Sequence, residues 1–204
     1  MLFYDAITPD TLDTLKRIQS QVELKETRLV GGTALALQLG HRLSIDLDIF
    51  GVWDQSLDIR KILGRCGETI EEHSTENIKV YTVSTIKVDV VYYTYAWLHE
   101  PVEADGLRFA GMPDIAPMKL EAINSRGSKK DFIDLAFLLK RFSLKEIVAW
   151  YRMKYPLGSE YLVLRSLVYF DDAEDDPMPR MLKPMRWEAA KAGIQQAVRE
   201  YSLA

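Results

Sequence analysis

Residues 29–50 constrain the fold of this chain more strongly than any other segment. They begin with an apolar run typical of a short strand, and a Gly-Gly-Thr turn then opens a helix that we expect to stop at Gly40. Residues 45–50 alternate apolar and acidic side chains, which is typical of a second strand. The segment therefore predicts a strand, a tight glycine turn, a helix and another strand in direct succession.

Two carboxylates stand close together on the second of these strands. Asp46 and Asp48 are two residues apart, so their side chains share one face of a strand. Neighbouring carboxylates repel each other unless a positive group lies between them, and a hard cation such as Mg²⁺ takes oxygen ligands. The spacing thus fits a metal site, although an acidic, solvent-exposed strand face produces the same pattern.

The glycine turn before the helix has chemistry of its own. At a helix start, Gly31, Gly32 and Thr33 offer free backbone N–H groups and the positive end of the helix dipole, an arrangement that suits a phosphate. Most such turns are only tight connections. A phosphate cradle beside a carboxylate pair, however, is the equipment needed for nucleotidyl transfer.

Asp89 is unusual because it lies in an apolar strand pattern, Val-Asp-Val-Val. Burying an unpaired carboxylate costs several kcal/mol, so we expect its side chain to face either solvent or a cation. Residues 78–83 and 86–93 have strand patterns that predict a hairpin around this residue.

A second cluster of charged residues lies in the helical second half of the chain. Lys119 and Arg126 are spaced to share a face of one helix, and Asp131 and Asp134 share a face of the next. Lysine supplies a point charge for a triphosphate, whereas Arg126 can either grip a phosphate or pair with Asp131. Salt bridges between the two helices are the simpler alternative.

Composition sets limits on the class of protein. A chain of 204 residues is long enough for one large domain or two small ones, and its single cysteine excludes an internal disulfide. It has neither a run of about 20 apolar residues nor a signal peptide, so we expect a cytoplasmic protein without a membrane partner. The net charge of −4 disfavours an indiscriminate nucleic-acid binder. Residues 119–204 nevertheless hold 15 basic against 12 acidic residues, a modest surplus that suits RNA.

These patterns predict an α/β (α+β) fold: a small mixed β-sheet with flanking helices, followed by a helical C-terminal region. We place the first domain at residues 1–112 and the helical region at 113–204, with Asp114 as the N-cap of its first helix. The first helix of the chain should run to about Lys25. We expect the two regions to form a cleft into which Lys119 reaches.

Two motifs make the chain resemble a known family. The run GGTALALQLGHR-S-DLD-F in residues 31–50 and the pattern DIA-x-MKL with RG-x-KKDFIDL in residues 114–135 are similar to those of the AbiEii/AbiGii toxins. These toxins are nucleotidyltransferases of the DNA polymerase β-like superfamily. The resemblance extends over about residues 25–140 and implies a nucleotidyltransferase-like fold, an NTP substrate and Mg²⁺ or Mn²⁺ as cofactor.

The resemblance also implies roles for individual residues. Asp89 takes the place of the family's third carboxylate, and Asp134 would hold Lys130 or Arg126 in position. Metal ligands would be Asp46, Asp48 and Asp89. Nucleotide-binding residues would be Gly31, Gly32, Thr33, Lys119 and Arg126. Catalytic residues would be Asp46, Asp48, Asp89, Lys119 and Asp131.

The function expected from this resemblance is metal-dependent transfer of NMP from an NTP to an acceptor, with tRNA as a candidate acceptor. The protein would then be the toxin of a type IV toxin–antitoxin system, with a cognate antitoxin as partner. Two alternatives stay open. One is a non-catalytic nucleotide- or partner-binding protein of the same fold, which the complete set of acidic residues disfavours. The other is a small-molecule nucleotidyltransferase, which the likeness around Lys119 and Asp131 disfavours.

Overall fold

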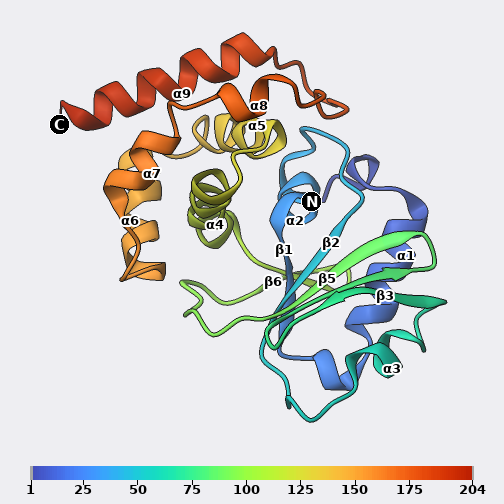
Figure 1. Ribbon diagram of the computed structural model, residues 1–204. Helices are drawn as coiled ribbons and strands as arrows, with labels where there is room; N and C mark the ends of the chain where they lie inside the picture. Colours follow the sequence, from blue (N-terminus) through green and yellow to red (C-terminus); the bar gives the residue numbers. More distant parts are fainter. Residues whose placement is uncertain (1, 204) are drawn as a thin grey trace. The chain divides into compact units, whose positions relative to one another are not determined.

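The structure, a computed structural model, describes residues 2–203, and the chain divides into two compact units (Figure 1). The first unit contains the residues up to Thr94 together with Glu100–Ala110. The second contains Tyr95–His99 and the residues from Gly111 onward. The chain therefore passes between the units three times, whereas the sequence suggested one boundary after residue 112, and that division into folding domains stays a prediction.

The first unit is built on a seven-stranded sheet with the strand order β3-β4-β5-β2-β1-β7-β6. Strands β2 and β5 are parallel, as are β1 and β7, and the other neighbours are antiparallel. The strands are β1 Thr27–Val30, β2 Leu47–Gly51, β3 Thr69–Ser74, β4 Ile78–Val83, β5 Ile86–Tyr92, β6 Val102–Ala104 and β7 Leu107–Phe109. A mixed sheet with helices confirms the predicted fold class.

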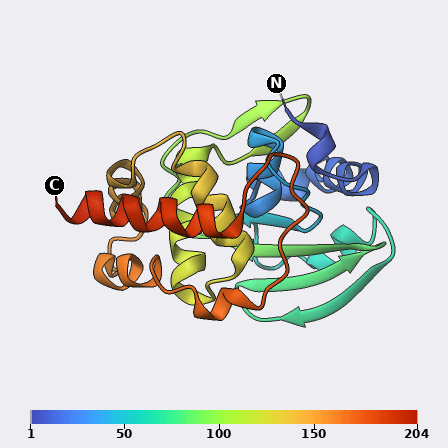
Figure 2. The same ribbon diagram turned by 90° about the horizontal axis from the view of Figure 1, so that it is seen from above.

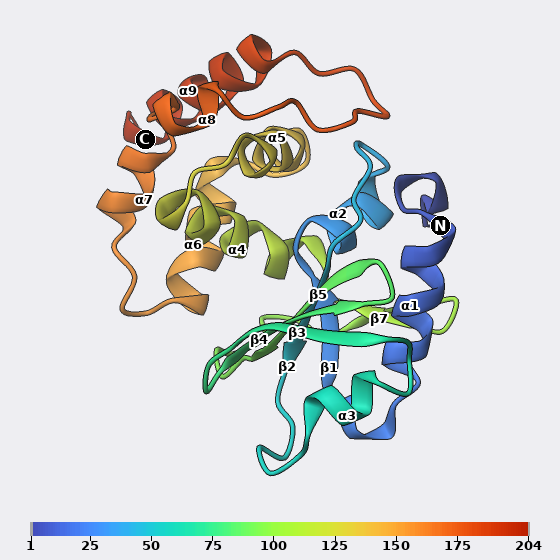
Figure 3. The ribbon, with the colours of Figure 1, turned by 45° about the vertical axis from the view of Figure 1, so that its right-hand side comes forward.

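Short helices flank this sheet. They are η1 Tyr4–Ala6, α1 Pro9–Gln19, η2 Val22–Leu24, α2 Gly31–Leu39 and α3 Ile59–Leu63. Helix α1 packs against β5 and β7, and α3 packs against β3 (Figure 3). The prediction that the first helix continues to about Lys25 was wrong, because the extended backbone of Gln21 interrupts it and a separate 3₁₀ turn follows.

The core of the first unit lies on one face of the sheet. The strand registers place six buried side chains on that face: Leu29, Leu47, Ile49, Tyr81, Val88 and Val90. Leu15 and Ile18 of α1 are fully buried as well. Because strand side chains alternate, the neighbouring residues Asp48 and Asp89 point to the opposite face. Packing of the apolar face thus determines where the carboxylates lie.

The second unit is helical. Its helices are α4 Met112–Ser125, α5 Lys129–Leu138, α6 Leu144–Lys154, α7 Glu160–Ser166, α8 Asp171–Glu174 and α9 Trp187–Ser202. Helix α4 contacts α5, α6 and α7, and α9 lies along α5 and α6 (Figure 2). Within residues 2–203, no helix combines the length and the apolar character needed to cross a membrane.

Asp114 has a different role from the one predicted. Helix α4 begins at Met112 with Gly111 as its N-cap, so Asp114 lies in the first turn. Its fully buried carboxylate accepts hydrogen bonds from the backbone N–H groups of Leu98 and His99, at 2.8 and 3.0 Å. It also pairs with the Lys154 ammonium at 2.9 Å. Asp114 therefore anchors the segment 95–99 instead of capping its own helix.

Candidate active site

The sheet brings two of the predicted carboxylates together. In the parallel pair of β2 and β5, Asp48 lies directly opposite Asp89, so both side chains project from the same face. Asp46 precedes β2 by one residue and Asp48 by two. The registers thus place Asp48 and Asp89 as neighbours, with Asp46 at the entrance to the strand.

Gly31 brings the start of α2 against this carboxylate pair. Its φ of +66° is a left-handed conformation that favours glycine, and a Cβ atom at this position would collide with the Asp48 carboxylate. The N-cap residue Val30 supplies no side-chain hydrogen bond to the helix. The Asp48 carboxylate therefore lies close to the positive end of the α2 dipole, which stabilises its negative charge.

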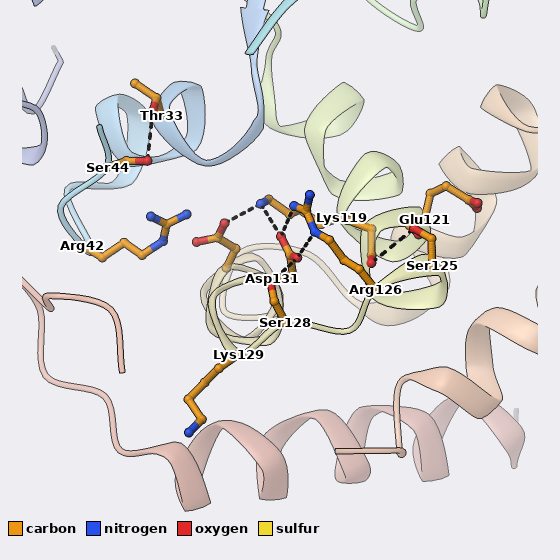
Figure 4. Close-up of polar contacts among 12 residues, drawn as sticks. Thr33, Arg42, Ser44, Lys119, Glu121, Ser125, Arg126, Ser128, Lys129 and Asp131 are labelled. Atoms are coloured by element: carbon orange, nitrogen blue, oxygen red, sulfur yellow. Dashed lines mark hydrogen bonds and ion pairs between the residues drawn. The ribbon is translucent and has the colours of Figure 1, made fainter. Parts of the chain in front are cut away.

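The segment after α2 supports the rest of the glycine turn. Thr33 Oγ1 lies 2.9 Å from Ser44 Oγ and also hydrogen-bonds the carbonyl oxygen of Asp46 (Figure 4). The buried guanidinium of Arg42 lies so close to Gly32 that a Cβ there would collide with it. The hydroxyl of Thr33, itself fully buried, is thus engaged in holding the approach to β2, and only the turn's backbone can offer further donors.

Lys87 contributes a positive charge to the carboxylate face. Its Nζ lies 2.9 Å from Asp89 Oδ2, two residues along the same strand. Desolvation alone would lower the pKa of the Lys87 ammonium, but its hydrogen bond to Asp89 and the charges of Asp89, Asp46 and Asp48 raise that pKa overall. Lys87 is therefore a fully charged cation at a group of three acids.

The carboxylate face meets some of the requirements of a divalent-cation site. The other oxygen of Asp89, Oδ1, is buried and has no hydrogen-bond partner in the part of the chain that the structure describes. A buried carboxylate oxygen without a donor suits a hard cation. Within residues 2–203, however, no three Asp, Glu, His or Cys side chains are arranged to hold a metal ion together. Asp48 and Asp89 thus fit such a site as two of its ligands, and the third position is not assembled.

A second polar cluster lies in the second unit, between α4 and α5. The Lys119 side chain is only 6% exposed, and its Nζ bonds Asp131 Oδ1 at 2.9 Å and Asp134 Oδ2 at 2.7 Å (Figure 4). Both carboxylates are fully buried. The spacing in the sequence predicted that Lys119 lies on one helix face and that Asp131 and Asp134 lie together on a face of the next helix. The contacts observed are salt bridges between the two helices, which was the simpler of the two expectations.

Asp131 lies at the centre of the hydrogen bonds in this cluster. Besides Lys119, it accepts hydrogen bonds from Arg126 Nε at 2.9 Å and from Ser128 Oγ at 2.7 Å. Burial alone would raise its pKa, but the charges of Lys119 and Arg126 and the hydrogen bonds from Arg126 and Ser128 hold the pKa of Asp131 well below its usual range. A carboxylate with this many donors stays ionised and makes a poor proton acceptor.

Sequence reasoning overlooked three residues of the carboxylate site. Arg42 and Ser44 belong to the family motif but had no predicted role, and Lys87 had none either. The alternation of residues 87 and 89 on one strand was a usable signal, because it places both side chains on one face. No local signal showed that Arg42 and Ser44 support the glycine turn, since these contacts depend on how the chain doubles back after α2.

A hollow in the second unit contains none of the predicted site residues. It has a volume of about 480 Å³ and lies among α5, α6 and α9, with mainly apolar lining residues such as Leu139, Phe142 and Ala197. The predicted chemistry therefore rests on the two polar clusters and not on this hollow.

Comparison with known proteins points to one family. A family model described as "Nucleotidyl transferase AbiEii toxin, Type IV TA system" matches residues 13–202. An uncharacterised protein of Aquifex aeolicus (strain VF5) is 32% identical over 196 residues, covering 93% of this chain and 94% of that protein.

Two solved structures show a similar fold. The nucleotidyltransferase toxin MenT4 of Mycobacterium tuberculosis H37Rv gives a TM-score of 0.63 at 14% identity, covering 93% of this chain and 82% of that one. ANT(2")-Ia, solved in complex with adenylyl-2"-tobramycin, gives a TM-score of 0.55 at 12% identity, covering 72% of this chain and 98% of that one.

Proposed function

The chain belongs to the AbiEii family of nucleotidyl transferase toxins, and from this premise we propose that it transfers NMP from an NTP to an acceptor hydroxyl with the help of a divalent cation. The observation that supports this most directly is the placement of Asp48 opposite Asp89, beside the start of α2. Carboxylates next to free backbone N–H groups combine a cation site with a phosphate site.

In this proposal, Asp46, Asp48 and Asp89 hold Mg²⁺ or Mn²⁺. A bound cation would offset the negative charge that develops around the α-phosphorus and favour ionisation of the acceptor hydroxyl. The backbone N–H groups of the turn at Gly31 and Gly32 would bind phosphate oxygens. Thr33 would contribute its backbone only, because its hydroxyl is already engaged.

The chemical step is a displacement at phosphorus. The acceptor oxygen forms a bond to the α-phosphorus, and the bond from that phosphorus to the bridging oxygen breaks. Pyrophosphate leaves with the bonding electrons, and the hydroxyl proton passes to solvent or to an acid of the carboxylate face. Asp131 is not the proton acceptor in this proposal, because four hydrogen bonds keep it ionised and occupied.

Lys119 and Arg126 are proposed as phosphate-binding residues of the second unit. Both already pair with Asp131, which fixes the direction of their positive groups. The side chain of Arg126 is 60% exposed and can exchange part of this pairing for a phosphate. Lys119 is nearly buried, so Asp131 and Asp134 act mainly by holding its ammonium in place.

We further propose a cognate antitoxin as partner, in keeping with the type IV toxin–antitoxin family, and tRNA as the acceptor. A small-molecule acceptor is the second candidate. It is favoured by the structural likeness to ANT(2")-Ia, which was solved with an adenylylated aminoglycoside. The two candidates differ in which acceptor becomes labelled.

The test is to incubate the protein with Mg²⁺ or Mn²⁺, each labelled NTP in turn, and either total tRNA or the aminoglycoside tobramycin. Wild-type protein should move label into RNA and release pyrophosphate. The Asp46→Ala/Asp48→Ala variant should lose at least about a thousandfold in rate while remaining folded, because it lacks two carboxylates that would hold the cation. Asp13→Asn removes an exposed acid on α1 and should keep full activity.

Each outcome distinguishes between the proposed function and one of its alternatives. Label in an aminoglycoside but not in RNA would replace tRNA by a small-molecule acceptor. NTP binding without pyrophosphate release on any acceptor would support the non-catalytic alternative. Full activity in the Asp46→Ala/Asp48→Ala variant would refute the cation assignment.

A further inference from the structure

Lys87 is a cation that the chain itself supplies to the carboxylate face. Its Nζ lies 2.9 Å from Asp89 Oδ2, and Asp89 lies directly opposite Asp48 across the parallel strand pair. The side chain of Lys87 is half exposed, at 50%, whereas that of Asp89 is 24% exposed. Lys87 can therefore swing away into solvent, while Asp89 is held by the sheet on both sides.

The two oxygens of Asp89 have different surroundings. Oδ2 bonds the Lys87 ammonium, and Oδ1 is buried without a hydrogen-bond partner among residues 2–203. An ammonium group has three donors and no preference for a fixed coordination geometry, so it neutralises one carboxylate oxygen without closing a complete ligand set. The pairing thus offsets one negative charge of the carboxylate face, and no three ligands are arranged to hold a metal ion within residues 2–203.

We propose that Lys87 is an internal counter-cation that competes with the divalent metal for Asp89 and so lowers the metal affinity of the site. Without metal, the ammonium offsets repulsion among the acids. When a divalent cation binds, Lys87 gives up Asp89 Oδ2 and turns to solvent. This inference rests on the proposed function, because it concerns the same carboxylates, and it adds a residue that sets the metal concentration at which the site fills.

The arrangement of the neighbouring acids also supports this role of Lys87. Asp48 lies directly opposite Asp89, so the acid that Lys87 bonds has a second carboxylate as its neighbour. The charged residue of the neighbouring strand β4 does not lie on the carboxylate face. Lys79 of β4 lies opposite Val90, and its Nζ bonds Ser74 Oγ at 3.4 Å.

Binding of Mn²⁺ to the full-length protein, measured by electron paramagnetic resonance of free Mn²⁺ without any nucleotide, tests the proposal. Lys87→Gln should bind Mn²⁺ about three- to tenfold more tightly than the wild type, because one competing positive charge at hydrogen-bonding distance is removed. Lys87→Arg keeps the charge and should stay within about twofold of the wild type. Lys79→Gln is the matched control and should not change the affinity.

A double-mutant cycle with Asp89→Asn shows whether Lys87 acts through Asp89. In the Asp89→Asn background, Lys87→Gln should no longer tighten Mn²⁺ binding. Unchanged or weaker binding by Lys87→Gln in the wild-type background would overturn the role of Lys87 and leave the metal site standing. Absence of Mn²⁺ binding in every variant would overturn both the site and the proposal, whereas binding by Lys87→Gln alone would support competition strongly.

Discussion

At the scale of single residues, Gly31 determines how closely the start of α2 approaches the Asp48 carboxylate. Its backbone has a left-handed φ, and its missing side chain leaves room for the Asp48 carboxylate. An alanine here meets two separate costs, a strained backbone of about 1–2 kcal/mol and a steric clash with a carboxylate that the β2–β5 pairing holds in place. The start of α2 and the Asp48 carboxylate therefore pack closely at this one position.

Gly31→Ala should therefore lower the free energy of unfolding by about 3 kcal/mol or more, and it should also weaken Mn²⁺ binding because Asp48 must move. Gly106→Ala is the matched control. Gly106 also has a positive φ, of +76°, but nothing lies within 4 Å of a Cβ built there. It should cost only the backbone strain of about 1 kcal/mol, with metal binding unchanged.

Urea unfolding and Mn²⁺ titration of both variants give these numbers. If Gly31→Ala and Gly106→Ala cost the same, the contact of Gly31 with Asp48 has no energetic weight. If Gly31→Ala is destabilised but binds Mn²⁺ normally, Asp48 does not hold the cation.

At the scale of elements, a buried ion pair ties α4 and α6 to the segment Tyr95–His99. Asp114 of α4 and Lys154 of α6 both have fully buried side chains and lie 2.9 Å apart. Lys154 also donates to the carbonyl oxygen of Ala96 at 3.1 Å and lies over the Trp97 ring, 4.5 Å from its centroid. Both charges therefore have further polar partners besides each other, which is the condition under which buried charges are tolerated.

Removing one partner of this pair should be costly. Asp114→Ala leaves the Lys154 ammonium and two backbone N–H groups without their acceptor, and it should lower the free energy of unfolding by about 3–5 kcal/mol. Lys154→Met should cost less, because Asp114 keeps its bonds from Leu98 and His99.

Equilibrium unfolding of the two single variants and the Asp114→Ala/Lys154→Met double variant checks this prediction. The double variant should be more stable than the sum of the single losses implies, because the second change removes the charge left unpaired by the first. Additive losses would mean that the two residues act independently. Arg152→Met, next to Lys154 but exposed, serves as a control and should cost less than about 1 kcal/mol.

The elements that the sequence predicted correctly are those whose structure is determined by residues close to one another in the chain. The glycine turn into α2 and the hairpin of β4 and β5 depend on neighbouring residues and appear as expected. Strand β3 was missed because its residues are mostly polar and exposed, as befits the edge strand of a sheet.

Long-range contacts explain what the sequence left out of the site. Asp48 reaches Asp89 from a neighbouring strand and Arg42 reaches Gly32 from the segment after α2, and no local spacing specifies these two contacts. The acidic run at residues 171–176 likewise contains the short helix α8. The Lys129 ammonium binds the C-terminal end of α8 by donating to the carbonyl oxygen of Glu174 at 2.9 Å. That contact also spans distant residues.

At the scale of the whole molecule, charge is distributed unevenly along the sequence. Residues 119–204 have a net charge of +3 and the remainder −7, so the chain as a whole repels a polyanion at a net −4. Several basic side chains of the second unit are exposed, namely Lys130, Lys140, Arg141, Lys145, Arg165, Arg180 and Arg186. RNA bound to such a protein must depend on a few local phosphate contacts instead of on the overall field.

This balance predicts a measurable salt dependence if RNA is the acceptor. With about two phosphate contacts, raising monovalent salt from about 50 to 200 mM should increase the KM for tRNA roughly tenfold. The apparent Kd for Mn²⁺ without RNA should change much less, because the carboxylate site is partly buried and less screened. Initial rates of label transfer across a salt series give the slope, and Lys130→Gln/Arg141→Gln should make it shallower. A KM for tRNA that does not change with salt would show that these basic side chains do not hold the acceptor, since counterion release accompanies every phosphate contact made by lysine or arginine.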